Sequence, residues 1–356
     1  MRGVAAPAES DLLPFARMGT VKRLFLAFVA VIVSACSRVP EELAISGPTM
    51  GTTYSIKIAD PPKDIESDDV RAAANEILAL IDRSMSGYRV DSEISRFNTS
   101  TSTQWFDVSS DLATVVEAAL QISRQSGGAF DITVAPLVRA WGFGASGEPR
   151  DLPDDALLAE LRAHVGFEKL HARLNPPALR KDDPALVVDL NGIAPGYAVD
   201  LLAQKLQTLA IKNFMIDIGG EVRAQGRNAR GQLWRIAVER PVDAEPEPYA
   251  IVQLDDTAVT TSGEYRHYYD RNGRRYSHTI DPRTGRPVSH SLASVVVIGS
   301  TSMQTDAWAT ALNVLGTREG HALASRLDMP VLFIDAQGGA LRSVMTQRFE
   351  RYLTHQ

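Results

Sequence analysis

The sequence predicts a mixed α/β fold of the α+β kind, in which mainly antiparallel sheets are flanked by helices. Three observations predict it. Stretches with helical periodicity alternate along the chain with short apolar runs rich in β-branched residues. The dipeptide Asn272-Gly273 lies between two alternating runs and is typical of a hairpin, because a type I′ turn needs positive φ twice. No internal repeat or low-complexity tract interrupts the body, so we expect one domain over residues 48–356.

The first 35 residues are predicted to be a secretory signal peptide. Lys22 and Arg23 precede an apolar run, residues 24–33, which is too short to span a bilayer comfortably. The run ends in Val33-Ser34-Ala35-Cys36, which resembles a bacterial lipobox. Cleavage before Cys36 would make it the lipid-bearing N-terminus, and each buried lipid methylene group adds about 0.8 kcal/mol of membrane affinity. An ordinary signal peptide with an incidental cysteine is the alternative.

Two further features belong to this end of the chain. Residues 1–17 add nothing to the signal, so Met18 is an alternative start. Residues 37–47 are predicted to be a tether between the lipid and the domain.

Helices are predicted where apolar residues recur with a period of 3.6. The first has Val70, Ala74 and Ile77 on one face, and the second, capped by Ser109 or Ser110, stops at Gly127. The predicted helices begin at Asp68, at Ser109 or Ser110, at Pro153, near Pro195 and at Gln304, and the last is expected to end at Gly316.

Strands are predicted where apolar and β-branched residues form short runs. These runs are residues 49–58, 186–188, 213–218, 234–238, 249–254, 265–269, 275–280, 292–298 and 331–335, of which the last is expected to end the fold. Residues 85–98 and 134–144 are predicted to be loops, and long ordered loops often carry function.

Composition and charge exclude several classes of function. The chain has 44% hydrophobic and 22% charged residues, as expected of a globular protein. Its net charge of −6 does not favour a nucleic-acid partner, which would require a basic face. Cys36 is the only cysteine, so an internal disulfide, a cysteine zinc site and a Cys-x-x-Cys redox pair are excluded.

Residues 186–200 are the stretch around which we expect the site to be organised. They are predicted to form a buried strand, a turn at Asn191-Gly192, and a helix with Pro195 in its first turn. Such a junction aims backbone N–H groups and the positive end of a helix dipole at one point, which suits a phosphate or pyrophosphate. Many such junctions serve packing alone, so the pattern needs support from the rest of the chain.

Two other stretches carry residues suited to chemistry. Asp306 and Thr310 are four residues apart on a predicted helix, so their oxygens share one face and form a hard-oxygen pair suited to Mg²⁺. The alternative is an ordinary helix N-terminus. His278 lies at the end of a hairpin arm and is a candidate general base, although a lone histidine is more often structural. Tyr54, Tyr88, Phe130 and Trp141 are candidates for stacking a flat ring or for packing in the core.

Taken together, these stretches resemble one family, the FAD:protein FMN transferases of the ApbE type. The similar stretches occur in the family's order and cover nearly all of the chain after residue 48: 49–52, 88–98, 127–131, 141–144, 189–200, 261–265, 278–287 and 305–312. The lipobox agrees with the resemblance, because many members of the family are lipoproteins.

The resemblance implies an enzyme that binds FAD and Mg²⁺, cleaves the pyrophosphate and moves FMN onto a threonine hydroxyl of a target flavoprotein, releasing AMP. It implies a base at His278 and metal contacts at the Gly192 carbonyl, Asp306 and Thr310, with Asp306 also essential for catalysis. By position it implies FAD contacts at Met50, Tyr88, Ala129, Phe130, Asp131, Asp189, Pro195 and Ile280. Pro195 departs from the family, which often has lysine and sometimes glutamate there, so any contact at 195 must be apolar or made by the backbone.

Two alternatives to this activity stay open at this point. The first is a Mg²⁺-dependent FAD pyrophosphatase that gives FMN and AMP, and the second is a non-catalytic periplasmic FAD-binding lipoprotein. The expected partners are FAD, subunits of membrane redox complexes such as sodium-pumping quinone reductases, and a membrane reached through the lipid anchor. The expected location is the periplasmic side of a bacterial membrane, the inner rather than the outer one.

Overall fold

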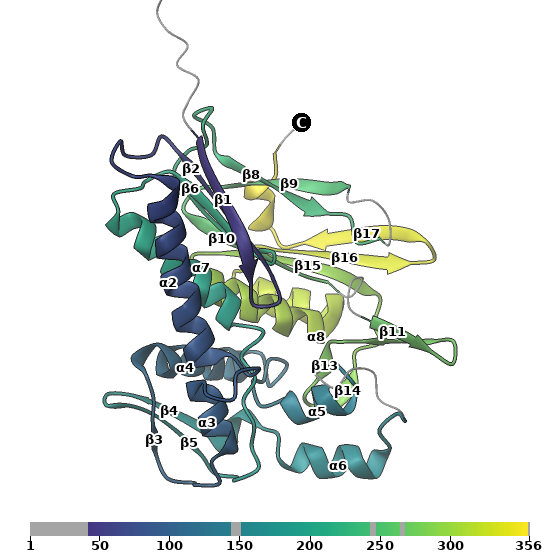
Figure 1. Ribbon diagram of the computed structural model, residues 1–356. Coiled ribbons are helices and arrows are strands. Elements are labelled where there is room, and N and C mark those ends of the chain that lie inside the picture. The colour runs from purple at the N-terminus through teal and green to yellow at the C-terminus, as the bar shows by residue number, and fades with distance from the viewer. Residues whose placement is uncertain (1–41, 144–150, 243–246, 264–267, 355–356) are drawn as a thin grey trace, which may run out of the picture. The chain divides into compact units, whose positions relative to one another are not determined.

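The computed structural model describes residues 42–143, 151–242, 247–263 and 268–354 (Figure 1). They lie in one compact unit, Glu41–Gln356. The predicted signal peptide and Cys36 lie outside the described residues. Within these residues no helix is both long enough and apolar enough to cross a membrane.

An eight-stranded sheet forms the centre of the unit. Its strand order is β1-β2-β6-β7-β10-β15-β16-β17, and every neighbouring pair is antiparallel. The predicted fold class, with mainly antiparallel strands flanked by helices, is confirmed. The strands are β1 (Glu42–Thr49), β2 (Thr52–Ala59), β6 (Phe214–Ile218), β7 (Glu221–Gln225), β10 (Thr257–Gly263), β15 (Leu292–Gly299), β16 (Val331–Gln337) and β17 (Ala340–Met345).

Helices cover one face of this sheet (Figure 1). Alternate residues of the strands point toward them, so Ile56, Ile58 and Ile216 are fully buried in the larger hydrophobic core. Helices α7 and α8 lie side by side in this layer. The helices of the layer are α2 (Ser67–Met85), α7 (Ala194–Thr208) and α8 (Ser302–Arg326), and α4 (Ser110–Gln125) packs on the far side of α8, against β4 and β5.

The opposite face of the sheet carries a second core. A two-stranded sheet, β8 (Trp234–Glu239) and β9 (Pro248–Leu254), packs on it together with the short helix η2 (Phe349–Tyr352). The sheet is therefore buried on both sides over β7, β10 and β15.

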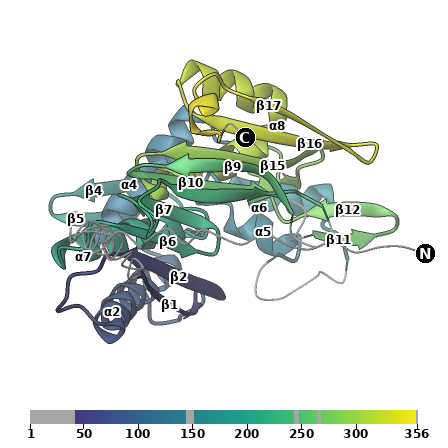
Figure 2. The same cartoon turned by 90° about the horizontal axis from the view of Figure 1, so that it is seen from above.

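The remaining elements are small. The hairpin β11 (Tyr268–Arg271) and β12 (Arg274–Ser277) extends away from the large sheet in both views (Figures 1 and 2). Asn272 and Gly273 have φ of 53° and 73°, so the predicted type I′ turn is confirmed. The other elements are α3 (Glu93–Thr99), β3 (Phe106–Asp107), α5 (Ala135–Ala140), α6 (Asp155–Ala163), η1 (Phe167–Lys169), β4 (Leu170–Leu174), β5 (Pro177–Lys181), β13 (Ile280–Asp281) and β14 (Arg286–Pro287).

The predicted tether over residues 37–47 is wrong from Glu42 onward. Residues 42–47 belong to β1, which pairs with β2 along its whole length, and Ile45 is buried against the helices. The Ser46-Gly47-Pro48 stretch favours a linker in the sequence, but the pairing with β2 overrides this local preference. The compact unit therefore begins before residue 48.

The predicted strand at 186–188 is also wrong, because these residues have no ladder partner among the described strands. A side chain takes the place of a neighbouring strand. Asn98 Nδ2 donates to the Val188 carbonyl and Asn98 Oδ1 accepts from the Val188 N–H, both at 2.8 Å. The buried Lys181 ammonium donates to the Leu186 carbonyl at 3.1 Å. These bonds hold the segment extended and satisfy its buried backbone.

Both predicted loops contain short helices. Residues 85–98 include most of α3, whose Ile94 and Phe97 are buried, and residues 134–144 include α5, whose Leu137 is buried. A helix of one or two turns shows only one apolar repeat, which is too little for periodicity to detect.

The C-terminal prediction needs two changes. The helix predicted to end at Gly316 is interrupted there, with φ 70° and ψ 176°, but continues as α8 to Arg326. His290 Nε2 lies 2.8 Å from the Asn313 carbonyl oxygen, three residues before the interruption. In addition β17 follows β16, so the strand at 331–335 is not the last one.

Candidate functional site

Most of the predicted site residues line one cavity of about 270 Å³. The cavity lies where the α4–α5 connection, the Gly192 turn, the segment after β12 and the middle of α8 meet. Its lining includes the predicted residues Ala129, Phe130, Asp131, Asp189, Gly192, His278, Ile280 and Thr310. Segments far apart in the sequence therefore bring the predicted flavin, metal and base positions to one place.

The turn before α7 is held from both sides. The Asp189 N–H donates to the Ile132 carbonyl at 2.7 Å, and Asp189 Oδ1 accepts from the Asn191 N–H at 2.9 Å. Burial raises the pKa of the Asp189 carboxyl. A Cβ on Gly192 would lie 3.2 Å from Thr310 Oγ1 and 3.3 Å from Phe130 Cε2. The absence of a side chain at 192 thus lets the turn, α8 and Phe130 approach one another.

One helical turn after Gly192, α7 itself contacts α8 at Gly196. The Gly196 N–H donates to Asp306 Oδ2 at 3.0 Å, and a Cβ on Gly196 would lie only 2.3 Å from the Ser302 carbonyl oxygen. Only glycine permits this approach. Asp306 is 5% exposed and lies beside the cavity rather than in its lining.

This contact corrects the prediction of free N–H groups at the start of α7. The Ala194 N–H donates to the Leu190 carbonyl at 2.9 Å, and the Tyr197 N–H donates to the Ile193 carbonyl at 3.1 Å. Pro195 has no N–H, and the Gly196 N–H is bonded to Asp306. The first turn of α7 therefore binds a carboxylate of its own chain.

The electrostatics around Asp306 favour a cation. Burial raises the pKa of Asp306 to about 7, although the hydrogen bond from Gly196 lowers it. Burial and the negative charge of Asp306 raise the pKa of Glu221, on β7, well above its ordinary value. Neither carboxylate forms an ion pair within the described residues, whereas nearby Asp200 is paired with Arg223 at 2.9 Å.

Asp131 lines the cavity, but the protein already uses both of its carboxylate oxygens. Oδ1 accepts from the Thr133 N–H and hydroxyl at 2.8 and 2.7 Å, and Oδ2 accepts from the Phe167 N–H at 2.9 Å. Burial nevertheless raises its pKa. The carboxylate thus fixes the wall of the cavity that carries Ala129 and Phe130.

His278 follows β12 and is half-buried in the cavity wall. The Phe143 ring meets it edge-on, with centroids 6.4 Å apart. Phe143 stacks on Tyr269, Tyr269 on Tyr276, and Tyr276 on Trp141, at 5.1 to 5.6 Å. The hairpin and the aromatic residues at 141–143 therefore hold the histidine in place together.

Four predicted residues do not line the cavity: Met50, Tyr88, Pro195 and Asp306. Met50 is 39% exposed in the turn between β1 and β2, and Tyr88 is 72% exposed. Arg89, beside Tyr88, pairs with Asp82 and Asp91 at 3.2 and 2.8 Å. Pro195 is half-buried in the first turn of α7.

Sequence reasoning missed several lining residues, among them Asn191, Ser262 and Thr279. Asn313 orients two of them, because its Nδ2 donates to Ser262 Oγ at 3.0 Å and to Thr279 Oγ1 at 3.4 Å. Asn313 is three residues after Thr310, so its place on the same helical face is a signal that the sequence contains. Gly144, Glu264 and Tyr265, which carry part of the resemblance, lie outside the described residues.

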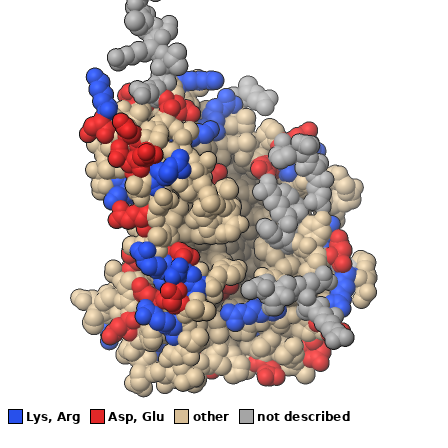
Figure 3. Space-filling model, viewed as in Figure 1, with Lys and Arg blue, Asp and Glu red and all other residues tan. Residues whose placement is uncertain are grey.

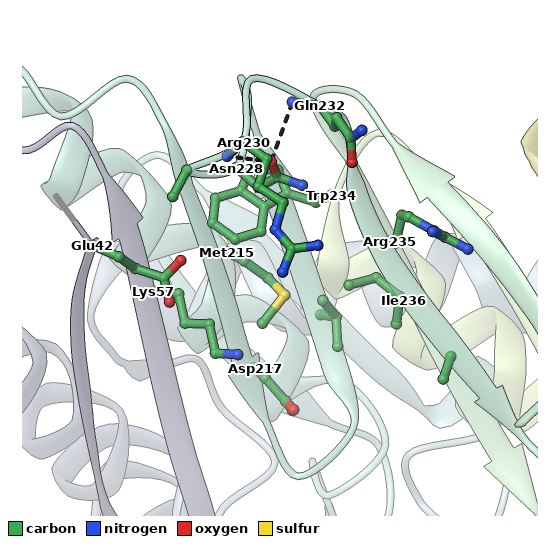
Figure 4. Close-up of a pocket in the computed structure, with 13 residues that line it drawn as sticks. Glu42, Lys57, Met215, Asp217, Asn228, Arg230, Gln232, Trp234, Arg235 and Ile236 are labelled. Atoms are coloured by element: carbon green, nitrogen blue, oxygen red, sulfur yellow. Dashed lines mark hydrogen bonds between the residues drawn. The ribbon is translucent and has the colours of Figure 1, made fainter. Parts of the chain in front are cut away.

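A larger cavity of about 470 Å³ lies on the other face of the sheet, between β2, β6 and β8 (Figure 4). It contains none of the predicted site residues, and charged side chains of both signs line it, including Lys57, Arg230 and Asp217. Acidic and basic residues are also mixed over the face shown in Figure 3, which carries no broad basic patch among the described residues.

Comparison with known proteins decides the family. The sequence model of the ApbE family matches residues 50–333. The chain belongs to the ApbE family. It is 40% identical to the FAD:protein FMN transferase of Vibrio cholerae, over 91% of this chain and 96% of that protein. It is 34% identical to the FAD:protein FMN transferase of Escherichia coli, over 93% of this chain and 97% of that protein.

Solved structures of the family share the fold. The flavin transferase ApbE from Vibrio cholerae matches with a TM-score of 0.82 and 42% identity, over 88% of this chain and all of that one. The apo form of the Pseudomonas stutzeri flavinyl transferase ApbE matches with a TM-score of 0.81 and 37% identity, over 88% of this chain and 97% of that one. The predicted family and its enzyme class, a transferase, are confirmed.

Replacing Gly196 by alanine should push α7 and α8 apart, because the added Cβ would meet the Ser302 backbone. We expect the free energy of unfolding, measured by urea denaturation, to fall by about 1–3 kcal/mol, as at other overpacked sites. Gly87→Ala is the matched control, since nothing lies within 4 Å of a Cβ at 87. Equal stability of the two variants would contradict the close approach of the helices.

Proposed function

We propose that this member of the ApbE family transfers FMN from FAD to a threonine hydroxyl of a target protein, with Mg²⁺ bound and with AMP as the leaving group. The observation that carries the proposal is the single cavity in which Thr310, Gly192 and His278 meet the predicted flavin contacts. Ligand sites usually measure about 300–1,000 Å³, so a dinucleotide must extend beyond this cavity. The exposed Met50 and Tyr88 are then available to contact the part outside it.

The residues present fit a magnesium ion. The described residues contain no group of three or more His, Cys, Asp or Glu side chains that could hold a metal, so a cation here needs other oxygens. Asp306, the Thr310 hydroxyl and the Gly192 carbonyl would supply them, and Mg²⁺ prefers such hard ligands completed by water and phosphate. Gly196 bonds only Oδ2 of Asp306, which leaves the other oxygen for the cation.

A bound Mg²⁺ would neutralise charge on the pyrophosphate and on the leaving AMP, which is the main requirement of phosphoryl transfer. The protein's own part is to position and to move a proton. His278 would accept the proton of the incoming threonine hydroxyl as its oxygen bonds to the FMN phosphorus. The bond from that phosphorus to the bridging oxygen breaks, and AMP leaves with the bridging oxygen.

The two alternative activities use the same site differently. A pyrophosphatase would place water where the threonine hydroxyl attacks. A carrier of FAD would need neither a base nor a cation, so the presence of His278 and Thr310 in one cavity argues against it. Incubation with FAD, Mg²⁺ and an acceptor domain separates the three: covalent flavin fluorescence with AMP indicates a transferase, free FMN a hydrolase, and intact FAD a carrier.

Asp306→Ala should abolish AMP release and acceptor labelling, because it removes the only carboxylate of the proposed cation site. Labelling is read as flavin fluorescence of the acceptor after denaturing electrophoresis, and AMP by chromatography. Wild type treated with EDTA should match the variant, and added Mg²⁺ should restore the wild type alone. Labelling by Asp306→Ala at the wild-type rate would rule out this site.

His278→Ala should leave the FAD dissociation constant nearly unchanged and slow FMN transfer by about 10²–10⁴-fold, the usual value of a general base. Flavin fluorescence measures binding, and single-turnover labelling of the acceptor measures transfer. The matched control is His171→Ala, because His171, on β4, pairs with Asp182 and does not line the cavity. A proportional loss of binding and transfer in His278→Ala would show that the histidine binds FAD rather than acting as the base.

We propose further that the chain is a lipoprotein on the periplasmic side of a bacterial membrane, the inner one rather than the outer, and labels subunits of membrane redox complexes. The lipobox-like residues ending at Cys36 support the anchor. Cys36→Ser should move the protein from the membrane fraction to the soluble periplasmic fraction, as followed by immunoblotting. Metabolic labelling with a fatty acid should mark wild type only, and a variant that keeps its label would exclude Cys36 as the anchor.

A further inference from the structure

The structure contains a second buried carboxylate on α7 that the proposed mechanism does not use. Asp200 is 7% exposed and does not line the cavity. Its Oδ1 accepts from the Ser302 N–H at 2.9 Å, and its Oδ2 accepts from the Met303 N–H at 2.9 Å. These two N–H groups are at the start of α8, where no helical carbonyl can accept from them.

Helix α8 therefore has two caps. Its own N-cap residue, Thr301, accepts from the Gln304 N–H at 3.4 Å. Asp200 caps the same end from a neighbouring helix and places a negative charge at the positive end of the dipole. The local cap stabilises α8 alone, whereas the cap from Asp200 also ties α8 to α7.

The tie from Asp200 is one of three contacts in a regular series. Asp200 meets Ser302, Gly196 meets Asp306, and Gly192 meets Thr310. Each step is four residues along both segments, in opposite directions, which on a helix is about 6 Å. The last two steps include Asp306, Gly192 and Thr310, the three positions of the proposed cation site.

We propose that Asp200 is a positioning residue that sets the register of α8 against α7 and so places Asp306 and Thr310 against Gly196 and Gly192. The assignment of these groups as cation ligands rests on the proposed function, but the register does not. A slip of α8 by one residue would rotate Asp306 by about 100° and move its carboxylate away from the Gly196 N–H.

Arg223 pairs with the Asp200 carboxylate beside the start of α8. Its Nη1 donates to Asp200 Oδ1 at 2.9 Å and to the Ser300 carbonyl at 2.7 Å, just before α8 begins. Burial raises the pKa of Asp200 above its ordinary value, although the N–H groups of Ser302 and Met303 and the contact with Arg223 lower it. The strand β7, the middle of α7 and the start of α8 are thus joined at one carboxylate.

The test compares Asp200→Ala, Asp200→Asn and the control Thr301→Ala in the full-length chain. The first readout is hydrogen exchange of the Gly196 amide, which reports its bond to Asp306 without any need for activity. The second is the Mg²⁺ concentration that gives half-maximal FMN transfer, with FAD affinity and thermal midpoint measured alongside.

In Asp200→Ala we expect the Gly196 amide to exchange about tenfold faster, as when one hydrogen bond to a charged group is lost. We expect the Mg²⁺ requirement to rise about 10- to 100-fold, the usual effect of removing a group that orients metal ligands, with FAD affinity nearly unchanged. Asp200→Asn retains one acceptor oxygen, so its Gly196 exchange rate and its Mg²⁺ requirement should lie between those of wild type and Asp200→Ala. This variant replaces Asp200→Ala in the test if the alanine variant does not fold. Thr301→Ala should lower the thermal midpoint without changing either readout.

Two results would overturn the proposal. One is an unchanged Gly196 exchange rate in both Asp200 variants. The other is an equal rise of the Mg²⁺ requirement in Thr301→Ala, which would show that loss of any cap on α8 has the same effect. Failure of the proposed function is a separate result: wild type would then transfer no FMN, and Gly196 exchange would still decide whether Asp200 sets the register.

Discussion

The close approach of α7 and α8 at Gly196 is the constraint on which the site depends. It brings the Asp306 carboxylate to a backbone N–H at 3.0 Å and buries it beside the cavity. A side chain at 196 would meet the Ser302 backbone, so the helices could not lie at this distance. The same approach, continued toward Gly192, places Thr310 against the turn that carries Asp189 into the cavity.

Burial of acidic groups is costly unless they are protonated, paired or matched by a cation. The protein pairs one of the carboxylates next to α8, Asp200, with Arg223 and leaves Asp306 and Glu221 without such a partner among the described residues. The raised pKa values of Asp306 and Glu221 reflect the lack of a compensating positive charge beside them. A divalent cation between Asp306 and a pyrophosphate would balance it, which is why the electrostatics and the donor set support the same proposal.

Local sequence signals predicted the elements that local rules determine. The Asn272-Gly273 turn, the helix capped at Ser109 and the buried strand at 292–298 all occur as expected. The failures have different causes: helices α3 and α5 are too short for periodicity to detect, whereas the segment at 186–188 depends on a partner far along the chain. Residues 186–188 look like a strand, yet their partner is the Asn98 side chain, ninety residues earlier.

The same distinction holds for the site. The i, i+4 spacing of Asp306 and Thr310 and the glycine at 192 could be predicted, because both are visible in short motifs. The tie between Asp200 and Ser302 could not, since a carboxylate that caps another helix 102 residues away leaves no local pattern. Met50 and Tyr88 are assigned by resemblance alone, and because both are exposed and lie outside the cavity lining, their contacts with FAD stay a prediction.

Pro195 is compatible with the hydrogen bonding at the start of α7. The start of α7 was expected to bind phosphate through free N–H groups, but Asp306 accepts from the Gly196 N–H, and Ala194 and Tyr197 donate to backbone carbonyls. A proline at 195 removes an N–H that this turn does not need and fixes φ for helix entry. The Asp306 carboxylate occupies the positive end of α7, where a phosphate of the ligand was expected. A diphosphate near this helix end would therefore face a negatively charged side chain. The proposed Mg²⁺ on Asp306 would offset this repulsion, so the electrostatics at this helix end are consistent with the proposed cation site.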